Sequence, residues 1–149
     1  MNRVLVDADA CPVKDEILRV AQRLEAEVVF VANRRMRLVE TALVRQVVVS
    51  GGFDAADDWI AENAQAGDVV VTADIMLADR CLKREAQVLG PDGRAFTPAN
   101  IGSAIAMRAL NRDLRDMGAI SGAGPAFART DRSRFLQELD RILRRLQRQ

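Results

Sequence analysis

The sequence predicts an α/β fold of three layers, α/β/α, built on a central and mainly parallel sheet. Short apolar, β-branched runs alternate with amphipathic stretches of helical length, which is the order expected when helices join parallel strands. Two of these runs, residues 4–6 and 69–71, lead into aspartates and then into a helical pattern, as strands of open α/β sheets do. With 149 residues, 49% of them apolar, the chain can form one domain with a sizeable core.

Strands and helices alternate through the first half of the chain. Pro12 fits the first turn of a helix, where its missing N–H costs nothing, and apolar residues follow it at helical spacing. Gly51 and Gly52 close the third strand, and Asp54 is placed to cap the next helix. The expected order is a strand, a helix, two strands and a helix, at residues 3–9, 12–26, 27–33, 44–50 and 53–66.

The second half continues the alternation and then becomes helical. A turn at Gly67 starts the strand that ends at Asp74, and the residues at 91–93 favour a tight reversal. Asn100 can cap the helix that follows. The expected elements are the strand ending at Asp74, a helix over 75–86, a strand over 87–89, a helix over 101–117, a loop over 118–131 and a helix over 132–149. The whole chain, 1–149, forms a single domain, in which 118–149 is a C-terminal extension.

The last helix has an apolar stripe that needs a partner. Leucines recur at the 3-4-3 spacing of one helix face, and basic residues occupy the other face. The stripe can dock on the sheet of its own chain, or it can pair with a second copy and form a homodimer, and the sequence leaves both interpretations open. The leucines are Leu136, Leu139, Leu143 and Leu146.

Composition limits which catalytic and metal sites the chain can form and indicates the cell compartment. The chain contains no histidine and no tyrosine, which excludes Ser-His-Asp triads and His-ligated metals. The spacing of Cys11 and Cys81 fits neither a zinc site nor a disulfide framework, so reduced thiols are expected. No apolar run reaches the roughly 18 residues of a membrane span, and the N-terminus lacks the pattern of a signal peptide. We therefore expect a cytoplasmic protein without a membrane partner.

Aspartates occur where the expected strands end. In parallel strands these ends meet at one edge of the sheet, so carboxylates distant in sequence converge there. Each also has a structural interpretation, as a helix cap or as an ion pair such as that of Asp79 with Lys83. A shared crevice needs a cation to offset the repulsion, and oxygen ligands suit Mg²⁺ or Mn²⁺. The candidate catalytic residues are Asp7, Asp9, Asp57, Asp58, Asp74 and Asp79, with Asp7, Asp74 and Asp79 as metal ligands.

Two pairs among these aspartates carry a geometric expectation. If the first strand continues through Asp9, then Asp7 and Asp9 point to the same face of the sheet. Asp57 and Asp58 are neighbours on a helix and point about 100° apart, so only one of them should face the crevice.

Charge is unevenly distributed, although the net charge is only +1. Residues 51–79 hold seven acidic side chains and no Lys or Arg, whereas residues 80–149 hold fourteen basic and seven acidic ones. This division suits the binding of a polyanion whose reacting phosphate contacts metal ions. In the alternative interpretation, the solvated faces of the helices simply differ in the sign of their charge. Arg34, Arg35 and Arg37 follow the second strand and are candidate substrate-binding residues for phosphates, unless they form a solvated loop.

Several motifs resemble the YaiI/YqxD family of uncharacterised bacterial proteins, and the resemblance covers essentially the whole chain. These motifs are the run Asp7-Ala8-Asp9-Ala10-Cys11-Pro12 and the segments 50–60, 72–80 and 131–135. The family has no established activity. The segments 56–60 and 72–79 are also similar to the acidic motifs of PIN-like and flap-endonuclease-like nucleases, whose strand-end acids hold Mg²⁺ or Mn²⁺ for phosphodiester hydrolysis.

The wider resemblance implies a PIN-like, metal-dependent nuclease. It assigns Asp7 to the first-strand aspartate, Asp57 or Asp58 to the helix acid, and Asp74 and Asp79 to the last pair. The run that starts at Asp7 departs from the usual PIN pattern. The expected partner is nucleic acid, with RNA preferred to DNA.

Two other functions stay open. Asp7-x-Asp9 after an apolar strand resembles the nucleophile motif of haloacid-dehalogenase-type phosphatases, and residues 47–51 resemble their second motif. Against this, residues 51–79 lack the basic residue that such phosphatases place between their last two motifs. The other alternative is a module that binds nucleic acid without turnover.

Overall fold

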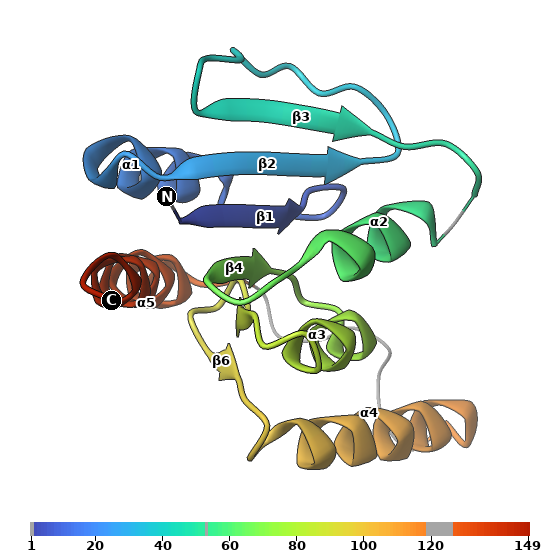
Figure 1. Cartoon of the computed structure of the whole chain (residues 1–149). Helices are drawn as coiled ribbons and strands as arrows, with labels where there is room; N and C mark the ends of the chain where they lie inside the picture. Colours follow the sequence, from blue (N-terminus) through green and yellow to red (C-terminus); the bar gives the residue numbers. More distant parts are fainter. Residues whose placement is uncertain (1, 53, 119–126) are drawn as a thin grey trace.

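The computed structural model describes residues 2–52, 54–118 and 127–149 and contains one six-stranded sheet with five helices around it (Figure 1). The strands lie in the order β3-β2-β1-β4-β5-β6. They are β1 (Arg3–Asp7), β2 (Glu27–Ala32), β3 (Val44–Val48), β4 (Asp68–Val71), β5 (Gln87–Leu89) and β6 (Ala95–Phe96). The helices are α1 (Lys14–Leu24), α2 (Ala55–Asn63), α3 (Ile75–Leu82), α4 (Ile101–Asp116) and α5 (Arg129–Gln147).

The sheet is parallel except at one edge. β1 lies between β2 and β4 and pairs in parallel with both, and β5 continues the parallel set beyond β4. β6 pairs antiparallel with β5 and is an addition to the strands predicted from the sequence. Its two residues are too few to show an alternating pattern, which explains why the sequence analysis missed it. The prediction of a mainly parallel sheet is confirmed.

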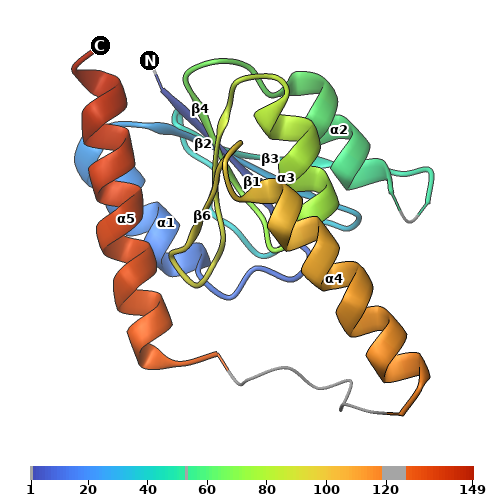
Figure 2. The same cartoon turned by 90° about the horizontal axis from the view of Figure 1, so that it is seen from below.

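Helices cover both faces of this sheet, so the predicted three-layer α/β/α class is confirmed (Figure 2). In β1, Val4 and Val6 enter the core shared with α1 and α5, whereas Leu5 enters the core shared with α2 and α3. This division follows from the strand geometry, in which successive side chains point to opposite faces. The central strands are therefore buried on both sides, as their unbroken apolar runs predict.

Three element boundaries differ from the sequence expectation in ways that matter for the site. β1 ends at Asp7 rather than at Asp9, and the chain turns at residues 9 and 10. α1 begins at Lys14, so Pro12 precedes the helix instead of lying in its first turn. α5 begins at Arg129, and the part of the expected loop at 119–126 lies outside the described residues.

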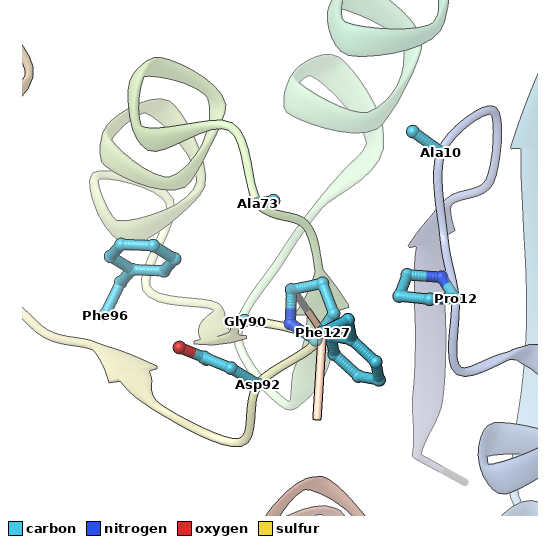
Figure 3. A pocket seen from close by; sticks show the side chains of 8 residues that line it. Ala10, Pro12, Ala73, Gly90, Asp92, Phe96 and Phe127 are labelled. Carbon is cyan, nitrogen blue, oxygen red and sulfur yellow. The ribbon is translucent and has the colours of Figure 1, made fainter. Parts of the chain in front are cut away.

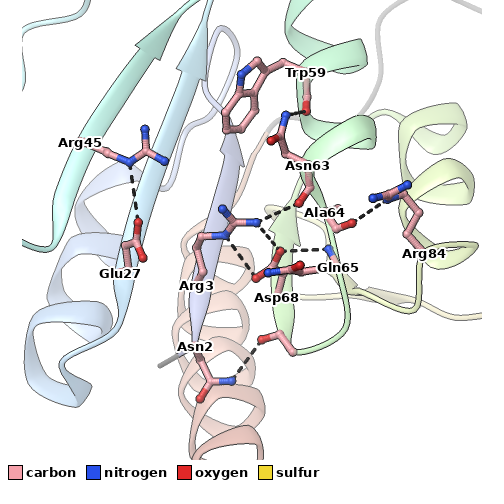
Figure 4. Close-up of polar contacts among 11 residues, drawn as sticks. Asn2, Arg3, Glu27, Arg45, Trp59, Asn63, Ala64, Gln65, Asp68 and Arg84 are labelled. Atoms are coloured by element: carbon pink, nitrogen blue, oxygen red, sulfur yellow. Dashed lines mark hydrogen bonds and ion pairs between the residues drawn. The ribbon is translucent and has the colours of Figure 1, made fainter.

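A buried ion pair joins β1 and β4 at their N-terminal ends (Figure 4). Arg3 and Asp68 are register partners, and Arg3 Nη2 lies 2.8 Å from Asp68 Oδ2. The Gln65 N–H donates to the same oxygen at 3.0 Å. The Asp68 side chain is only 5% exposed, so these donors replace the water that it loses on folding. The hydrogen bond to Asp68 also raises the pKa of Arg3.

α5 docks on its own chain, which confirms one of the two interpretations of its apolar stripe. Phe135, Leu139 and Leu143 are fully buried in the core shared with α1 and β1. Arg134 Nη1 donates to the Asp92 carbonyl at 3.1 Å and holds the helix against the turn after β5. Because the stripe is covered by the protein's own core, it is not available as the seam of the expected homodimer.

α4 extends away from the sheet (Figure 2). Ile101, at its start, is buried, whereas Met107 and Leu110 further along are 55% and 50% exposed. Neither α4 nor any other helix in the described ranges is both long enough and apolar enough to cross a membrane.

Candidate functional site

The C-terminal ends of β1 and β4 bring Asp7 and Thr72 together. Asp7 points to the same side of the sheet as Leu5, and Thr72 follows Val70 on that side, where α2 and α3 cover the sheet. The Thr72 hydroxyl donates to Asp7 Oδ2 at 2.9 Å. Burial raises the pKa of the Asp7 carboxyl, and the hydrogen bond from Thr72 opposes this rise.

Asp74 caps α3 and is fixed next to this pair. Its Oδ1 accepts hydrogen bonds from the Met76 N–H at 2.9 Å and the Leu77 N–H at 3.1 Å, so the capping interpretation is confirmed. The Asp74 N–H donates to the Thr72 hydroxyl oxygen at 3.0 Å. One hydroxyl therefore contacts both the side chain of Asp7 and the backbone of Asp74. The cap uses Oδ1, which leaves Oδ2 for other contacts.

The third carboxylate comes from α2. Ala56 and Ile60 pack on the sheet, and Asp57 lies half-buried at the edge of that packed face. Burial, the charges of Asp7 and Asp74 and a hydrogen bond with Asp74 raise the pKa of Asp57 to about 7. The Asp57 carboxyl therefore keeps its proton to a much higher pH than an ordinary aspartate does. We call Asp7, Asp57 and Asp74 the acidic cluster.

Asp9 is held outside this cluster by the turn after β1. Its carboxylate oxygens accept the Asn33 N–H at 3.1 and 3.2 Å, which ties this turn to the end of β2. The condition under which Asp7 and Asp9 would share one strand face is not met, because β1 stops before Asp9. The charge of Asp9 still contributes to the raised pKa of Asp7.

Asp58 and Asp79 form ion pairs on the helices. Asp58 Oδ1 lies 2.9 Å from Arg80 Nη1, and Asp79 Oδ2 lies 3.1 Å from Lys83 Nζ, as its structural interpretation predicted. Of the neighbours Asp57 and Asp58, only Asp57 contacts Asp74 and joins the acidic cluster, although Asp58 lines the same hollow as Asp57 and Asp74. The structure also leaves Asp79 outside the charges that raise the pKa of Asp7 and Asp57.

The acidic cluster fits a cation only if other ligands take part. Within the described residues, no three Asp, Glu or Cys side chains are arranged to hold a metal ion by themselves. Mg²⁺ commonly needs fewer, since it binds through one or two carboxylates and completes its shell with waters and substrate phosphates. The carboxylate oxygens of Asp7 and Asp74 suit that arrangement. Asp79, expected as a further ligand, pairs with Lys83 instead.

A hollow of about 330 Å³ opens beside the acidic cluster and contains two arginines that the sequence analysis did not select. Asp57 and Asp74 line it together with Arg80 of α3 and Arg108 of α4. A signal for Arg80 was present, since it ends the motif at 72–80. The position of Arg108 depends on the packing of α4 against α3, which the sequence pattern does not specify.

The basic segment after β2 lines a different hollow, of about 480 Å³. Arg34 and Arg35 border it together with Lys14 and Asp9, whereas Arg37 does not line it. All three arginines are exposed. None of Asp7, Asp57 and Asp74 lines this hollow, so a substrate must extend beyond the acidic cluster to reach it.

Neither cysteine is suited to act as a nucleophile. Both are free thiols, as expected. Burial raises the pKa of Cys11, and it raises the pKa of Cys81 to about 11, so both thiols are protonated at neutral pH. They act as small apolar side chains packed into the two cores.

Comparison with known proteins identifies relatives along almost the whole chain. Residues 5–145 match the family described as "Uncharacterized BCR, YaiI/YqxD family". A UPF0178 protein of Sphingopyxis alaskensis is 59% identical over 146 residues, which cover 97% of this chain and 95% of that protein. A UPF0178 protein of Agrobacterium fabrum is 55% identical over 144 residues, which cover 97% of this chain and 94% of that protein. A UPF0178 protein of Mesorhizobium japonicum is 58% identical over 142 residues, which cover 95% of this chain and 92% of that protein. No solved structure matches the chain significantly.

Proposed function

The chain belongs to the YaiI/YqxD family of uncharacterised bacterial proteins, and we propose that it is a metal-dependent nuclease that hydrolyses phosphodiester bonds at the acidic cluster. The observation that carries this proposal is the meeting of Asp7, Asp57 and Asp74 at the C-terminal ends of two central strands. Ligand sites of open α/β folds occur at this edge of the sheet. Three carboxylates in one place repel one another, and a divalent cation offsets that repulsion.

The proposal assigns a separate task to each member of the cluster. Asp7 and Asp74 would hold Mg²⁺ or Mn²⁺, with waters and the substrate phosphate as the remaining ligands. The bound ion would polarise the phosphoryl oxygen and lower the pKa of an attacking water. Asp57, which lies next to Asp74, would accept the proton that this water releases.

The substrate we propose is a nucleic acid, with RNA preferred to DNA. Arg80 and Arg108 line the same hollow as Asp57 and Asp74. The Arg108 guanidinium can bind a phosphate with two parallel hydrogen bonds, and Arg80, whose Nη1 pairs with Asp58, can donate from its other N–H groups. Arg34 and Arg35 lie where they can contact a neighbouring phosphate of a longer strand. Basic residues line two separate hollows, and a polymer with several phosphates can contact both, whereas a small phosphate ester cannot.

Metal binding is the first test. The midpoint of thermal unfolding should rise with added Mg²⁺ or Mn²⁺, because a ligand that binds only the folded state stabilises it. Asp74→Asn should remove this shift while keeping the cap of α3, since Asn caps helices as well as Asp does. Asp113→Asn on the exposed side of α4 is the matched control for loss of one charge. An Asp74→Asn protein that keeps the full shift would exclude this metal site.

Turnover is the second test. Labelled single-stranded RNA and DNA should be cut in the presence of Mg²⁺ or Mn²⁺ and stay intact in EDTA. Asp7→Asn and Asp74→Asn should abolish the cleavage. Hydrolysis of a simple phosphate monoester without cutting of either polymer would favour the phosphatase alternative. Binding of RNA without any cutting would favour the non-catalytic module.

A further inference from the structure

An apolar cleft lies past the C-terminal ends of β1, β4 and β5, and Figure 3 shows the side chains that line it. Its volume is about 330 Å³, within the range of pockets that hold small ligands. Ala73, one of the lining residues, precedes Asp74, so the cleft and the cluster share one loop. The cleft is lined by Ala10, Pro12, Ala73, Gly90, Pro91, Asp92, Phe96 and Phe127.

Two phenyl rings give the cleft its aromatic character. Phe96 of β6 packs partly against the core beneath α2 and α3. Phe127, just before α5, is 37% exposed and borders the cleft near Pro12 (Figure 3). An exposed ring at the mouth of a cleft can take a second aromatic ring on its free face.

Phe127 is held in position from one side. The guanidinium carbon of Arg132 lies 4.9 Å from the centre of the ring, a cation–π contact. Arg132 Nη1 also donates to the Pro12 carbonyl at 2.6 Å and lies 3.4 Å from Glu16 Oε1. The Arg132 guanidinium therefore holds both the Phe127 ring and the loop at Pro12. The cleft thus has its shape before any ligand binds.

We propose that this cleft binds a purine or pyrimidine base whose attached phosphate lies at the acidic cluster. The proposal rests on the proposed function and specifies the part of the substrate that contacts the protein outside the reacting phosphate. A flat aromatic base suits phenyl walls, because base–aromatic stacking favours any base without reading its sequence. The shared loop at Ala73 and Asp74 places the base next to its own phosphate, and the rim residue Asp92 offers an acceptor for exocyclic amino groups.

Such a base can belong to a free mononucleotide or to a nucleotide within a single strand. The two sources present the same chemistry to the cleft and differ in the number of phosphates that can reach Arg34 and Arg35. Competition by AMP and by ribose 5-phosphate against a labelled RNA distinguishes them. AMP that competes as well as unlabelled RNA identifies the mononucleotide, and RNA that competes far better identifies the strand.

The test measures binding without turnover. Fluorescence anisotropy in EDTA compares a labelled single-stranded RNA with an oligomer of equal length whose central residues are abasic. Both carry the same phosphates, so repulsion from the acidic cluster is equal in the two. We expect the abasic oligomer to bind more weakly. Phe127→Ala should weaken binding of the RNA roughly tenfold and leave the abasic oligomer unchanged, and Phe127→Trp should restore the affinity.

Matched controls separate this inference from the nuclease proposal. Met117→Ala replaces an apolar side chain that is 78% exposed at the far end of α4 and should change neither affinity. Equal affinity of the wild-type protein for both oligomers, or an unchanged preference in Phe127→Ala, would overturn the base site. Base-dependent binding by a protein that cuts no polymer with Mg²⁺ or Mn²⁺ would overturn the nuclease proposal and support the base site.

Discussion

Thr72 and Asp7, 65 positions apart in the sequence, meet through a hydrogen bond of 2.9 Å from the threonine hydroxyl to Asp7 Oδ2. The same hydroxyl oxygen accepts the Asp74 N–H at 3.0 Å. A single side chain thus sets the distance between the end of β1 and the start of α3. Thr72 is 2% exposed, so water does not easily replace either contact.

Thr72→Val should destabilise the protein by about 1–3 kcal/mol. Valine has the same shape but leaves the half-buried Asp7 carboxyl and the Asp74 N–H each without a partner. Thr72→Ser keeps the hydroxyl and should be destabilised less, because it removes only the contacts of one methyl group. Urea denaturation of the three proteins at neutral pH checks this order. A valine variant as stable as the serine variant would show that the hydroxyl contributes little.

Asp57 should make the stability of the protein decrease as the pH rises. The folded state holds the proton of Asp57 up to a pKa of about 7, whereas the unfolded chain releases it near the ordinary aspartate value of about 3.9. Between these values the folded state binds more protons, so the free energy of unfolding falls as the pH rises through this window. Asp57→Asn should flatten the fall and raise the stability above pH 7.

Chemical denaturation at several pH values between 4 and 8 measures this effect. Asp58→Asn is the matched control, because it removes the neighbouring charge and only an exposed ion pair with Arg80. It should keep the slope of the wild-type protein. An Asp57→Asn variant with the same slope would mean that Asp57 does not carry the proton.

Asp68→Asn should lower the free energy of unfolding by about 2–4 kcal/mol. The substitution leaves the Arg3 guanidinium, which is 19% exposed, without its anionic partner between two buried strands. Glu138→Gln removes one member of an exposed pair with Arg141 and should cost less than about 0.5 kcal/mol. Thermal or urea unfolding of both variants tests the difference. Similar losses in the two would indicate that the burial of Asp68 adds nothing to the pair.

Gly93→Ala should destabilise the protein more than Gly51→Ala. Both glycines have positive φ, +85° and +116°, so both substitutions strain the backbone. A Cβ at residue 93 would also lie 2.6 Å from atoms of Arg134 and Phe135, whereas residue 51 has open space around it. We expect the free energy of unfolding to fall by about 1 kcal/mol in Gly51→Ala and by at least about 2 kcal/mol in Gly93→Ala. Equal losses would mean that α5 can shift without cost.

The sequence specified the architecture and the two strand ends of the site because these depend on simple patterns. Unbroken apolar runs followed by Asp7 and Asp74 predict parallel neighbours with carboxylates at one edge, and the structure has this arrangement. The helix period also agrees with the different partners of Asp57 and Asp58, since Asp57 contacts Asp74 and Asp58 pairs with Arg80, although both aspartates line the same hollow. Each of these inferences uses a local period and one general rule about parallel sheets.

The remaining features depend on contacts that a local pattern does not contain. β1 stops at Asp7, and the next carboxylate, Asp9, accepts the Asn33 N–H at the end of β2. Arg108 reaches the hollow through the docking of α4, and Phe127 lines the apolar cleft through its contact with Arg132. These are side chains brought together by tertiary packing, and their spacing in the sequence follows no period.

The burial of α5 has a consequence for how the protein is made. Phe135 and Leu139 complete the core around Val4 and Val6, and Arg132 binds Pro12 from 120 positions away. β1 therefore leaves the ribosome well before α5, the helix that covers it, has been made. Until α5 is made, Val4 and Val6 lack the part of their core that this helix supplies, and contacts across so long a stretch of chain form slowly.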